Sequence, residues 1–348
     1  MTPMLAMADI LRQNDKSTEV IFIGRCGGKE NEAIRRAGYE PYEIEVEGLK
    51  RSLSPRNVRA VLRAIRARRT ARSLLRELSP DAVIGTGGYV CWPVLSAAHS
   101  LGIKCAIHES NAYPGLVTRR CSRWVDLVML GYSEAEKHLR HSCKSYVTGN
   151  PVRNQVGRIS RSRARAALKI PSGKTVVLSF GGSLGAKAIN DSVTEMIEKD
   201  GGRSGILYIH ATGEKWYNEY REKEREWSRI LPYINDMPVY LAAADIGILR
   251  CGAMTLAEVE AAGLPSILIP SPNVTANHQF KNARALADDG CAVVIRENDL
   301  NSEALKSEIL HLVRDNPLRH GIREKLQQRH KGTDTRIFAA ISTLVTDK

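Results

Sequence analysis

The sequence lacks the cysteine spacing of a disulfide framework or a zinc site. Its seven cysteines form an odd set, and no two of them stand as a Cys-x-x-Cys pair. Disulfide-rich scaffolds and structural zinc sites both show regular cysteine spacing, so neither is expected here. The pattern favours a protein of the reducing cytosol.

Long hydrophobic runs are also absent. No window holds eighteen consecutive apolar residues, so no segment is predicted to span a bilayer. The stretch Met1 to Asp9 has no basic n-region, and Asp9 interrupts its apolar residues, so we do not expect a signal peptide. Hydrophobic residues still make up 43% of the chain, which excludes a disordered or fibrous protein. We expect a globular protein that contacts a membrane only at its surface.

Negative charge is scarce relative to positive charge. Lys and Arg number 51 and Asp and Glu 38, which leaves a net charge of +13. Such an excess favours an anionic partner, namely nucleic acid, a phosphate-rich ligand or an acidic membrane surface. The segment Lys50–Arg76 holds ten basic residues and no acidic one, so the rest of the chain sums to only +3.

The apolar residues of this basic segment recur at roughly helical spacing. They are Val58, Val61, Leu62, Ile65, Leu74 and Leu75. A solvated helix packed along one stripe would show this pattern, and so would a basic helix lying on anionic lipid. Aromatic residues are absent from the segment, so single-stranded nucleic acid has little support as a partner. We favour an anionic membrane surface and expect no nucleic-acid partner.

The 348 residues exceed what one hydrophobic core usually organises, so two domains are expected. Short apolar runs alternate with helical patterns, which is typical of a parallel sheet covered by helices on both faces. In the first half the expected strands are Glu19–Gly24, Tyr42–Val46, Asp81–Gly85, Lys104–His108, Leu127–Leu130 and Ser145–Thr148, and the expected helices include Pro55–Leu78, Tyr89–Gly102 and Ser133–His138.

The pattern restarts after the basic stretch Arg158–Arg165 and the breaker cluster Ile170–Gly173. The strands expected there are Thr175–Phe180, Gly205–His210, Ile246–Leu249, Ser266–Ile269 and Ala292–Ile295. We place the boundary near Pro151–Ile159 and predict two doubly wound α/β domains, residues 1–152 and 153–331.

The first domain departs from this plan at its start. Thr2 can cap a helix, Pro3 suits its first turn and Met4–Leu11 is rich in apolar residues, so the chain opens on a helix. A doubly wound domain normally begins with a strand whose following loop supplies the first ligand-binding turn. That strand and loop are missing from the pattern, which indicates a start codon placed too far downstream or a real loss.

Glycine-rich segments follow two of the predicted strands. Gly181–Ala186 (GGSLGA) follows Thr175–Phe180 and precedes a helix, and Gly85–Tyr89 (GTGGY) follows a strand in the first domain. Glycines let the backbone approach a ligand, and amides at a helix start attract phosphate oxygens. A tight strand-to-helix turn would look the same, but one such loop in each half favours phosphate binding.

Polar side chains follow other strands. Thr255 and Glu258 lie three apart on a predicted helix, where a carboxylate can bind a ribose diol or remain a solvated or capping residue. Gln279 and Asn282 are again three apart and suit sugar hydroxyls, although such amides are more often surface residues. The segment His108-Glu109-Ser110-Asn111 ends a strand, where a His–Glu pair suits acid–base chemistry or simple hydrogen bonding.

Eight motifs in this order resemble a known family. They are GTGGY (85–89), HESN (108–111), GNPVR (149–153), GGSLGA (181–186), IND-M (234–237), RCGAMTLAE (250–258), AAGLP (261–265) and NHQFKNA (277–283). The set is similar to the MurG family, the undecaprenyl-diphospho-muramoylpentapeptide N-acetylglucosaminyltransferases of glycosyltransferase family 28. The resemblance runs along the whole chain.

The resemblance implies a GT-B fold, in which two Rossmann-like domains face each other across a cleft and a C-terminal helix, about 332–348, packs back on the first domain. It implies a hexosyltransferase that transfers GlcNAc from UDP-GlcNAc to lipid I, with inversion at the anomeric carbon, giving lipid II in peptidoglycan synthesis. The expected location is the cytoplasmic face of the bacterial membrane, held peripherally. Other cell-wall synthesis proteins are further expected partners, and no cofactor or metal is required.

The resemblance also implies roles for individual residues. The residues implied to bind UDP-GlcNAc are Asn111, Arg153, Ser183, Ile234, Ala253, Met254, Thr255, Glu258, His278, Gln279 and Asn282. Among them Ser183 would contact the diphosphate, Glu258 the ribose and Gln279 the GlcNAc hydroxyls, with Ile234 beside the uracil. Gly87, Gly88 and Tyr89 would bind the acceptor diphosphate, and His108 and Glu109 are the candidate catalytic pair.

The sequence departs from the family pattern in two places. A glycine-rich loop of the form GGTGGH is expected immediately before Met1, and its histidine has no replacement here. Leu184 stands where a glutamine is common. Two alternatives therefore remain: another GT-B enzyme, such as a diacylglycerol glycosyltransferase or a UDP-GlcNAc epimerase, or a catalytically impaired UDP-GlcNAc-binding remnant.

Overall fold

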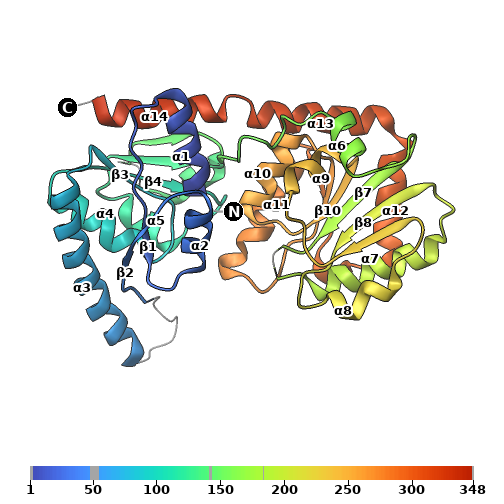
Figure 1. The fold of residues 1–348 in the computed structure, drawn as a ribbon, viewed down its shortest axis with the longest axis horizontal. Helices are drawn as coiled ribbons and strands as arrows, with labels where there is room; N and C mark the ends of the chain where they lie inside the picture. Colours follow the sequence, from blue (N-terminus) through green and yellow to red (C-terminus); the bar gives the residue numbers. More distant parts are fainter. Residues whose placement is uncertain (1–2, 48–54, 141–142, 183, 347–348) are drawn as a thin grey trace. The chain divides into compact units, whose positions relative to one another are not determined.

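The computed structural model describes residues 3–47, 55–140, 143–182 and 184–346, with the backbone alone described for 55–62. The chain divides into two compact units (Figure 1): Met1–Pro151 together with Gly332–Lys348, here called the N-terminal unit, and Val152–Lys331, the C-terminal unit. Both contain parallel strands connected by helices, which confirms the predicted fold class. Among the helices described, none combines the length and apolar character needed to cross a membrane.

The N-terminal unit carries its parallel strands in two sheets. Strands β1 (Ile23–Arg25) and β2 (Tyr42–Ile44) form one sheet, and β3 (Ala82–Gly85), β4 (Lys104–Glu109), β5 (Leu127–Leu130) and β6 (Ser145–Val147) form the other in that order. Its helices are α1 (Pro3–Asn14), α2 (Lys29–Arg36), α3 (Pro55–Leu78), α4 (Cys91–Ser100), α5 (Leu116–Cys121), the 3₁₀ helix η1 (Ser133–His138) and α14 (Thr333–Thr346).

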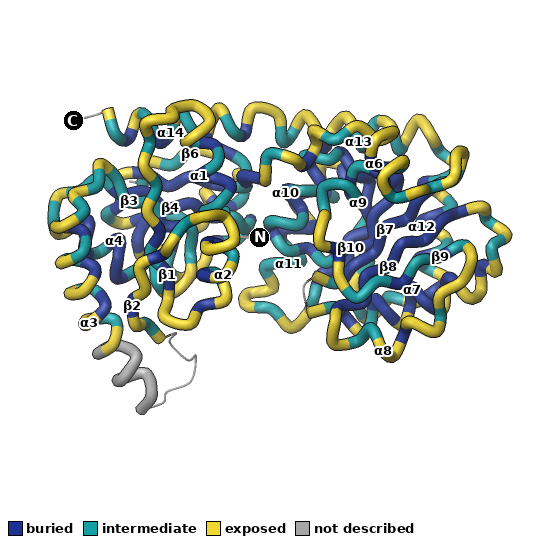
Figure 2. Tube along the Cα trace, in the orientation of Figure 1, coloured by how far each residue is buried: buried dark blue, intermediate teal, exposed yellow. Residues whose placement is uncertain are grey.

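Helices cover both faces of the four-stranded sheet. Cys105 and Ile107 of β4 point to one face and pack in a cluster with α3 and α4. Ala106 and Met129 belong to a different cluster, which includes residues of α1 and α14. Because successive side chains of a strand alternate between faces, the two clusters lie on opposite sides of the sheet. Figure 2 shows the buried strands between these helices.

The C-terminal unit is built on one six-stranded parallel sheet in the order β12-β11-β10-β7-β8-β9. The strands are β7 (Thr175–Phe180), β8 (Ile206–Ala211), β9 (Ser228–Leu231), β10 (Ile246–Leu249), β11 (Ser266–Leu268) and β12 (Ala292–Val294). The helices are α6 (Arg161–Ala167), α7 (Lys187–Asp200), α8 (Tyr217–Tyr220), η2 (Arg221–Lys223), α9 (Met237–Ala243), α10 (Ala253–Ala262), η3 (Thr275–Asn277), α11 (His278–Asp288), η4 (Glu297–Asp299), α12 (Ser302–Arg314) and α13 (Asn316–His330).

The basic stretch that marks the predicted domain boundary forms part of α6. Its Arg165 donates to the buried carboxylate of Asp245 at 2.6 Å, and Arg161 pairs with the same carboxylate. Asp245 also accepts the backbone N–H of Val176 on β7 at 2.8 Å. A buried charge is tolerated when it is paired and hydrogen-bonded, so these arginines tie α6 to the sheet.

Two strands differ from the sequence prediction. The run Glu19–Gly24 contributes only its end to β1. Among the described strands β1 pairs only with β2, and their ladder spans three residues. Phe22 is nevertheless buried and packs edge-on against Tyr39, with ring centroids 4.8 Å apart. Strand β9 was not predicted, because it alternates buried Ser228 with the partly exposed Arg229 at the sheet edge and has no continuous apolar run.

Candidate functional site

The sheet of the C-terminal unit reverses its strand order between β7 and β10. From β7 the chain moves outward through β8 and β9 on one side, then returns to β10 on the other. Phe180 and Leu249, the last residues of β7 and β10, lie side by side in the ladder. The loops after these two strands diverge, and doubly wound sheets bind ligands at such a switch point. The candidate site therefore lies where the glycine-rich loop leaves β7.

The glycine-rich loop Gly181–Ala186 turns directly from β7 into α7. Gly182 and Gly185 have φ values of +85° and +70°, which residues with a side chain rarely adopt. The Gly185 N–H donates to the Gly182 carbonyl at 3.0 Å, and Leu184 is 75% exposed. Ser183 lies outside the described residues. The free amides at the start of α7 and the helix dipole make this loop suited to an anionic group.

The same loop is held against the loop that follows β8. A Cβ atom at Gly185 would lie 2.0 Å from the carbonyl oxygen of Thr212. Asn190, fully buried on α7, donates from Nδ2 to that oxygen at 3.0 Å. Sequence reasoning missed Asn190, because its partner is 22 residues away and no local pattern reveals the contact.

Glu258 lies on α10, whose first residue follows β10 closely. The side chain is partly buried, and burial raises the pKa of its carboxyl above the ordinary value of 4.5, an effect that the positive charge of Arg153 opposes. No hydrogen-bond donor from the described residues reaches this carboxylate. A partly buried acceptor without a protein donor is suited to ligand hydroxyls. Thr255, one turn earlier on the same helix, is also partly exposed.

Gln279 and Asn282 on α11 both form hydrogen bonds with the backbone of Cys251, which follows β10. Gln279 Oε1 accepts the N–H of Cys251 at 3.3 Å and that of Ser271 at 2.9 Å. Asn282 is fully buried, and its Nδ2 donates to the Cys251 carbonyl at 3.2 Å. These contacts engage Oε1 of Gln279 within the protein, so Nε2 is the group of this side chain that is suited to a ligand, and the hydrogen bond from Asn282 supports Cys251.

Arg250 is a further residue of this edge to which the sequence assigned no role. Its guanidinium donates to the Ile269 carbonyl at 3.2 Å and pairs with Glu297, the first residue of η4. These contacts join the loops after β10, β11 and β12. The partner in η4 is 47 residues away, so the local sequence carries no signal for the pair.

The other donor-side residues predicted from the sequence also follow strands of this sheet, except Arg153 and Asn111, which follows β4 of the N-terminal unit. Ala253 opens α10 and is buried, and Met254 beside it is partly exposed. Ile234, in the loop after β9, is buried with 4% of its surface exposed. His278 opens α11, and its Nδ1 is 2.8 Å from the Thr275 carbonyl. Arg153 is exposed near the start of the unit.

In the N-terminal unit a second glycine-rich loop follows β3. Gly87 and Gly88 have φ values of +91° and +84°, and a Cβ added at either would meet no atom within 4 Å, so the backbone before α4 is bare. The thiol of Cys91 donates to the Gly87 carbonyl at 2.7 Å. Tyr89 is 58% exposed and leaves its ring accessible to a partner.

His108 and Glu109 end β4, as the sequence predicts, but hydrogen bonds within the protein occupy both. His108 is fully buried, with Nε2 at 3.1 Å from the Gly149 carbonyl and Nδ1 at 3.3 Å from the Ser110 hydroxyl. Burial lowers the pKa of its imidazole, which favours the neutral ring. This geometry favours a structural role for His108 rather than the acid–base role expected from the sequence.

The Glu109 carboxylate accepts four hydrogen bonds from the segment that follows it, three from the loop and one from α5. Two come from the N–H and the side-chain amide of Asn111, both at 3.0 Å. The others come from the Gly115 N–H at 2.8 Å and the Thr118 hydroxyl at 2.7 Å. With its lone pairs engaged in this way, Glu109 shapes the loop, and Asn111 is positioned by it.

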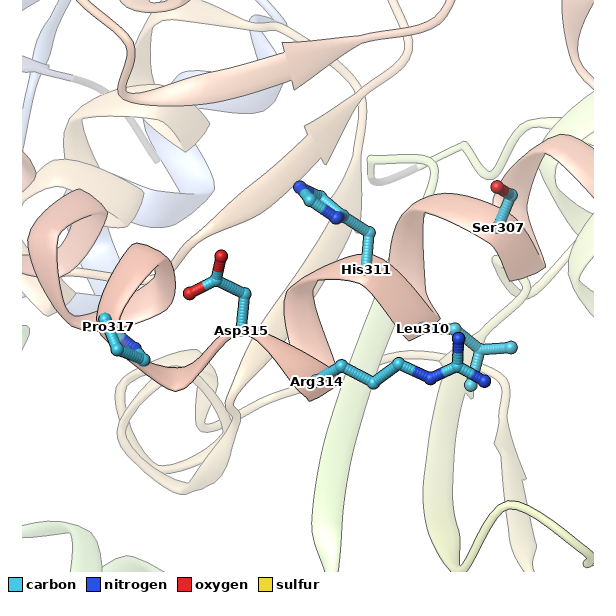
Figure 3. Close-up of a pocket in the computed structure, with 6 residues that line it drawn as sticks. All are labelled: Ser307, Leu310, His311, Arg314, Asp315 and Pro317. Atoms are coloured by element: carbon cyan, nitrogen blue, oxygen red, sulfur yellow. The ribbon is translucent and has the colours of Figure 1, made fainter.

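One surface cavity lies apart from all the predicted residues. This depression, of about 480 Å³, lies where α12 meets α13. Figure 3 shows the residues that line it, Ser307, Leu310, His311, Arg314, Asp315 and Pro317. Its residues belong to the outer part of the C-terminal unit, not to the loops after β7 and β10. Among the described residues, no cluster of three or more His, Cys, Asp or Glu side chains is arranged to hold a metal ion.

Comparison with known proteins agrees with this architecture. The glycosyltransferase family 28 N-terminal domain matches residues 1–130, and the family's C-terminal domain matches residues 176–335. The crystal structure of MurG from Acinetobacter baumannii superposes with a TM-score of 0.77 at 26% identity, covering 98% of this chain and 95% of that one. The fold and the two matched domains together define a glycosyltransferase of the GT-B class.

Curated relatives narrow the class further. One relative, from Acetivibrio thermocellus, is 40% identical to this chain over 99% of this chain and 95% of the relative. It is named UDP-N-acetylglucosamine–N-acetylmuramyl-(pentapeptide) pyrophosphoryl-undecaprenol N-acetylglucosamine transferase. A relative of the same name from Caldanaerobacter subterraneus subsp. tengcongensis is 38% identical, over 98% of this chain and 96% of the relative. The chain belongs to this family of transferases, within glycosyltransferase family 28, as the motifs predict.

A UDP-GlcNAc 2-epimerase shares the fold at greater distance. The Neisseria meningitidis enzyme superposes with a TM-score of 0.70 at 14% identity, covering 99% of this chain and 96% of that one. A likeness at this identity shows a shared fold and gives no support to epimerase activity.

We expect Gly185→Ala to destabilise the C-terminal unit strongly. The new Cβ would collide with the Thr212 carbonyl at 2.0 Å, and the residue would also be held at φ +70°. Urea unfolding should show a loss well above 2 kcal/mol, because the left-handed conformation alone costs about 1–2 kcal/mol.

The matched control is Gly173→Ala, at φ +77° with no atom within 4 Å of the added Cβ. It should lose only the conformational cost of about 1–2 kcal/mol. Equal losses in the two variants would contradict the close contact between the loops after β7 and β8.

Glu258→Gln should stabilise the protein increasingly as the pH rises. Burial raises the folded pKa above 4.5, so at lower pH the carboxyl is protonated in both folded and unfolded chains. Above 4.5 the unfolded chain ionises first, and the folded protein loses stability until the pH passes the folded pKa. The difference in unfolding free energy between variant and parent should grow over that range and then level off. A difference that shrinks as the pH rises would contradict the assigned direction.

Proposed function

We propose that this chain transfers GlcNAc from UDP-GlcNAc to undecaprenyl-diphospho-MurNAc-pentapeptide, lipid I, to give lipid II for peptidoglycan synthesis. The observation that carries the proposal is 40% identity over 99% of the chain with a relative named for this transfer. Apart from Asn111 and Arg153, the residues that the motifs predict for the donor also follow strands at one edge of the sheet in the C-terminal unit.

For the donor, the loop Gly181–Ala186 and the first turn of α7 are the proposed diphosphate site. Glu258 would accept hydrogen bonds from the ribose hydroxyls, and Gln279 would donate Nε2 to a GlcNAc hydroxyl. Met254 and Thr255 flank these positions on α10, and the buried Ile234 would support the uracil. The roles of Arg153, Ala253, His278, Asn282 and Ser183 follow from the same motifs.

The reaction makes a bond from an acceptor hydroxyl oxygen to the anomeric carbon and breaks the bond from that carbon to the UDP oxygen. The bonding electrons leave with UDP, so negative charge grows on the diphosphate, and the hydroxyl proton passes to a base. Backbone amides and the positive end of α7 are fixed before the reaction, and such preorganised dipoles stabilise developing charge. Inversion follows from attack opposite the leaving UDP.

On the acceptor side we propose that Gly87, Gly88 and Tyr89 receive the diphosphate of lipid I. The exposed Tyr89 and the bare backbone before α4 support this role. His108 and Glu109 act as positioning residues, because hydrogen bonds already engage them and Glu109 orients Asn111.

Incubation with UDP-GlcNAc and a lipid I analogue should release UDP and add one N-acetylhexosamine to the lipid, measured by mass spectrometry. Glu258→Gln should raise the KM for UDP-GlcNAc about tenfold, because hydrogen bonds to a charged group contribute about 1.5–3 kcal/mol. Glu303→Gln, an exposed glutamate on α12, is the matched control and should leave KM unchanged.

Three results would contradict the proposed reaction. They are transfer to diacylglycerol in place of the lipid I analogue, epimerisation of UDP-GlcNAc without an acceptor, and binding of UDP-GlcNAc with no product.

We further propose that the chain binds peripherally at the cytoplasmic face of the membrane, where the lipid I acceptor is anchored, through its basic segment Lys50–Arg76. Residues 50–54 lie outside the described part, as do the side chains of 55–62. In the described part of α3, Arg66 and Arg69 are exposed and Ile65 is 44% exposed beside them. Exposed cations around an apolar side chain suit an anionic bilayer surface.

The double variant Arg66→Gln/Arg69→Gln should bind anionic liposomes at least tenfold more weakly in co-sedimentation, since each basic residue near the surface contributes about 1 kcal/mol. Arg284→Gln/Arg314→Gln makes the same charge change on exposed residues of the C-terminal unit and should have no effect. Equal binding of the parent protein to neutral and anionic vesicles would argue against this contact.

A further inference from the structure

The loop after β8 brings an aromatic side chain against the glycine-rich loop. A Cβ at Gly185 would lie 2.9 Å from Cδ1 of Trp216, and one at Gly213 would lie 2.7 Å from the Cα of Gly185. The backbone N–H of Trp216 donates to the Gly213 carbonyl at 3.0 Å, which closes a turn. Trp216 therefore packs on the loop that is proposed to hold the diphosphate, and the glycines permit this close approach.

Two lysine ammonium groups lie over the Trp216 ring. The Lys215 Nζ is 4.5 Å from the ring centroid, and the Lys187 Nζ is 5.7 Å from it. Both distances are within the range of cation–π attraction, which contributes about 0.5–1 kcal/mol at exposed sites. The tryptophan thus places two positive charges beside the same loop.

The two lysines differ in how their charges are compensated. The Lys187 Nζ donates to Glu219 at 3.0 Å, to the Tyr220 hydroxyl at 3.2 Å and to Asp191 at 3.1 Å. These contacts, of which the hydrogen bond to Glu219 has the largest effect, raise the pKa of Lys187 and keep its ammonium group protonated. The two neighbouring carboxylates compensate this positive charge. Lys215 is exposed, and within the described residues it makes no ion pair with a carboxylate.

From this arrangement we infer that Lys215 is a binding residue for the diphosphate of the sugar nucleotide, and that Trp216 positions its ammonium group at the rim of the glycine-rich loop. The inference rests on the proposed function and extends it. An ammonium group binds phosphate as a mobile point charge, and it binds more tightly where a nearby aromatic face holds it in place. The charge that leaves with UDP would be stabilised by the same group.

The test compares the binding of UDP and of uridine by isothermal titration calorimetry. Lys215→Gln should weaken UDP binding about tenfold and leave uridine binding within twofold, because only UDP carries the diphosphate. The salt dependence of UDP binding should also become shallower, since one charge contact has been removed. Trp216→Leu should reproduce this selective loss, whereas Trp216→Phe keeps an aromatic face and should retain most of the affinity.

Lys223→Gln is the matched control, because Lys223 lies in η2 after the same loop and faces Glu198 at 3.8 Å. It should bind UDP like the parent. Thermal unfolding of each variant shows whether the fold is intact, and a Lys215→Gln variant that loses UDP and uridine binding equally would overturn the inference.

The two proposals fail in distinguishable ways. If the parent binds UDP and Lys215→Gln binds it equally well, the role of Lys215 is wrong and the proposed donor site stands. If the parent binds UDP no better than uridine, the diphosphate site itself is wrong, and the role of Lys215 falls with it.

Discussion

The reversal of strand order between β7 and β10 is the constraint on which the site of the C-terminal unit depends. Two adjacent parallel strands end together, and their loops must part because the connection after β7 runs to β8 on one side and the connection after β10 runs to β11 on the other. The glycine-rich loop and the start of α7 occupy one side of this opening, and Cys251 and α10 the other. The proposed phosphate, ribose and sugar sites would then belong to loops that the sheet places side by side.

Backbone contacts hold these loops in place. The Thr212 carbonyl excludes any side chain at Gly185 and accepts the amide of Asn190, and the amides of Gln279 and Asn282 hold Cys251 by its N–H and carbonyl. Polar side chains at the candidate site therefore also support the loops around it. Glu109 has a similar supporting role in the N-terminal unit, where its carboxylate accepts hydrogen bonds from the loop that follows it. A rigid frame of this kind fixes dipoles before a substrate arrives.

Much of the fold could be predicted, because buried parallel strands are continuous apolar runs. The predicted segments Leu127–Leu130, Thr175–Phe180 and Ile246–Leu249 coincide with β5, β7 and β10, and Pro55–Leu78 coincides with α3. The half-exposed strand β9 could not be predicted, because it has no continuous apolar run. Pairs such as Arg250 with Glu297 could not be predicted, since they depend on which strands become neighbours. The ligand roles remain predictions, and the acid–base role of His108 is disfavoured by burial, which no local pattern reveals.

We propose that the switch point between β7 and β10 is the sugar-nucleotide site. A crystal structure of the protein with UDP-GlcNAc tests it most directly. We expect the diphosphate to lie against Gly181–Ala186 and the first turn of α7, with the ribose hydroxyls on Glu258. A nucleotide bound elsewhere, such as in the depression between α12 and α13, with the β7 loop empty, would contradict it.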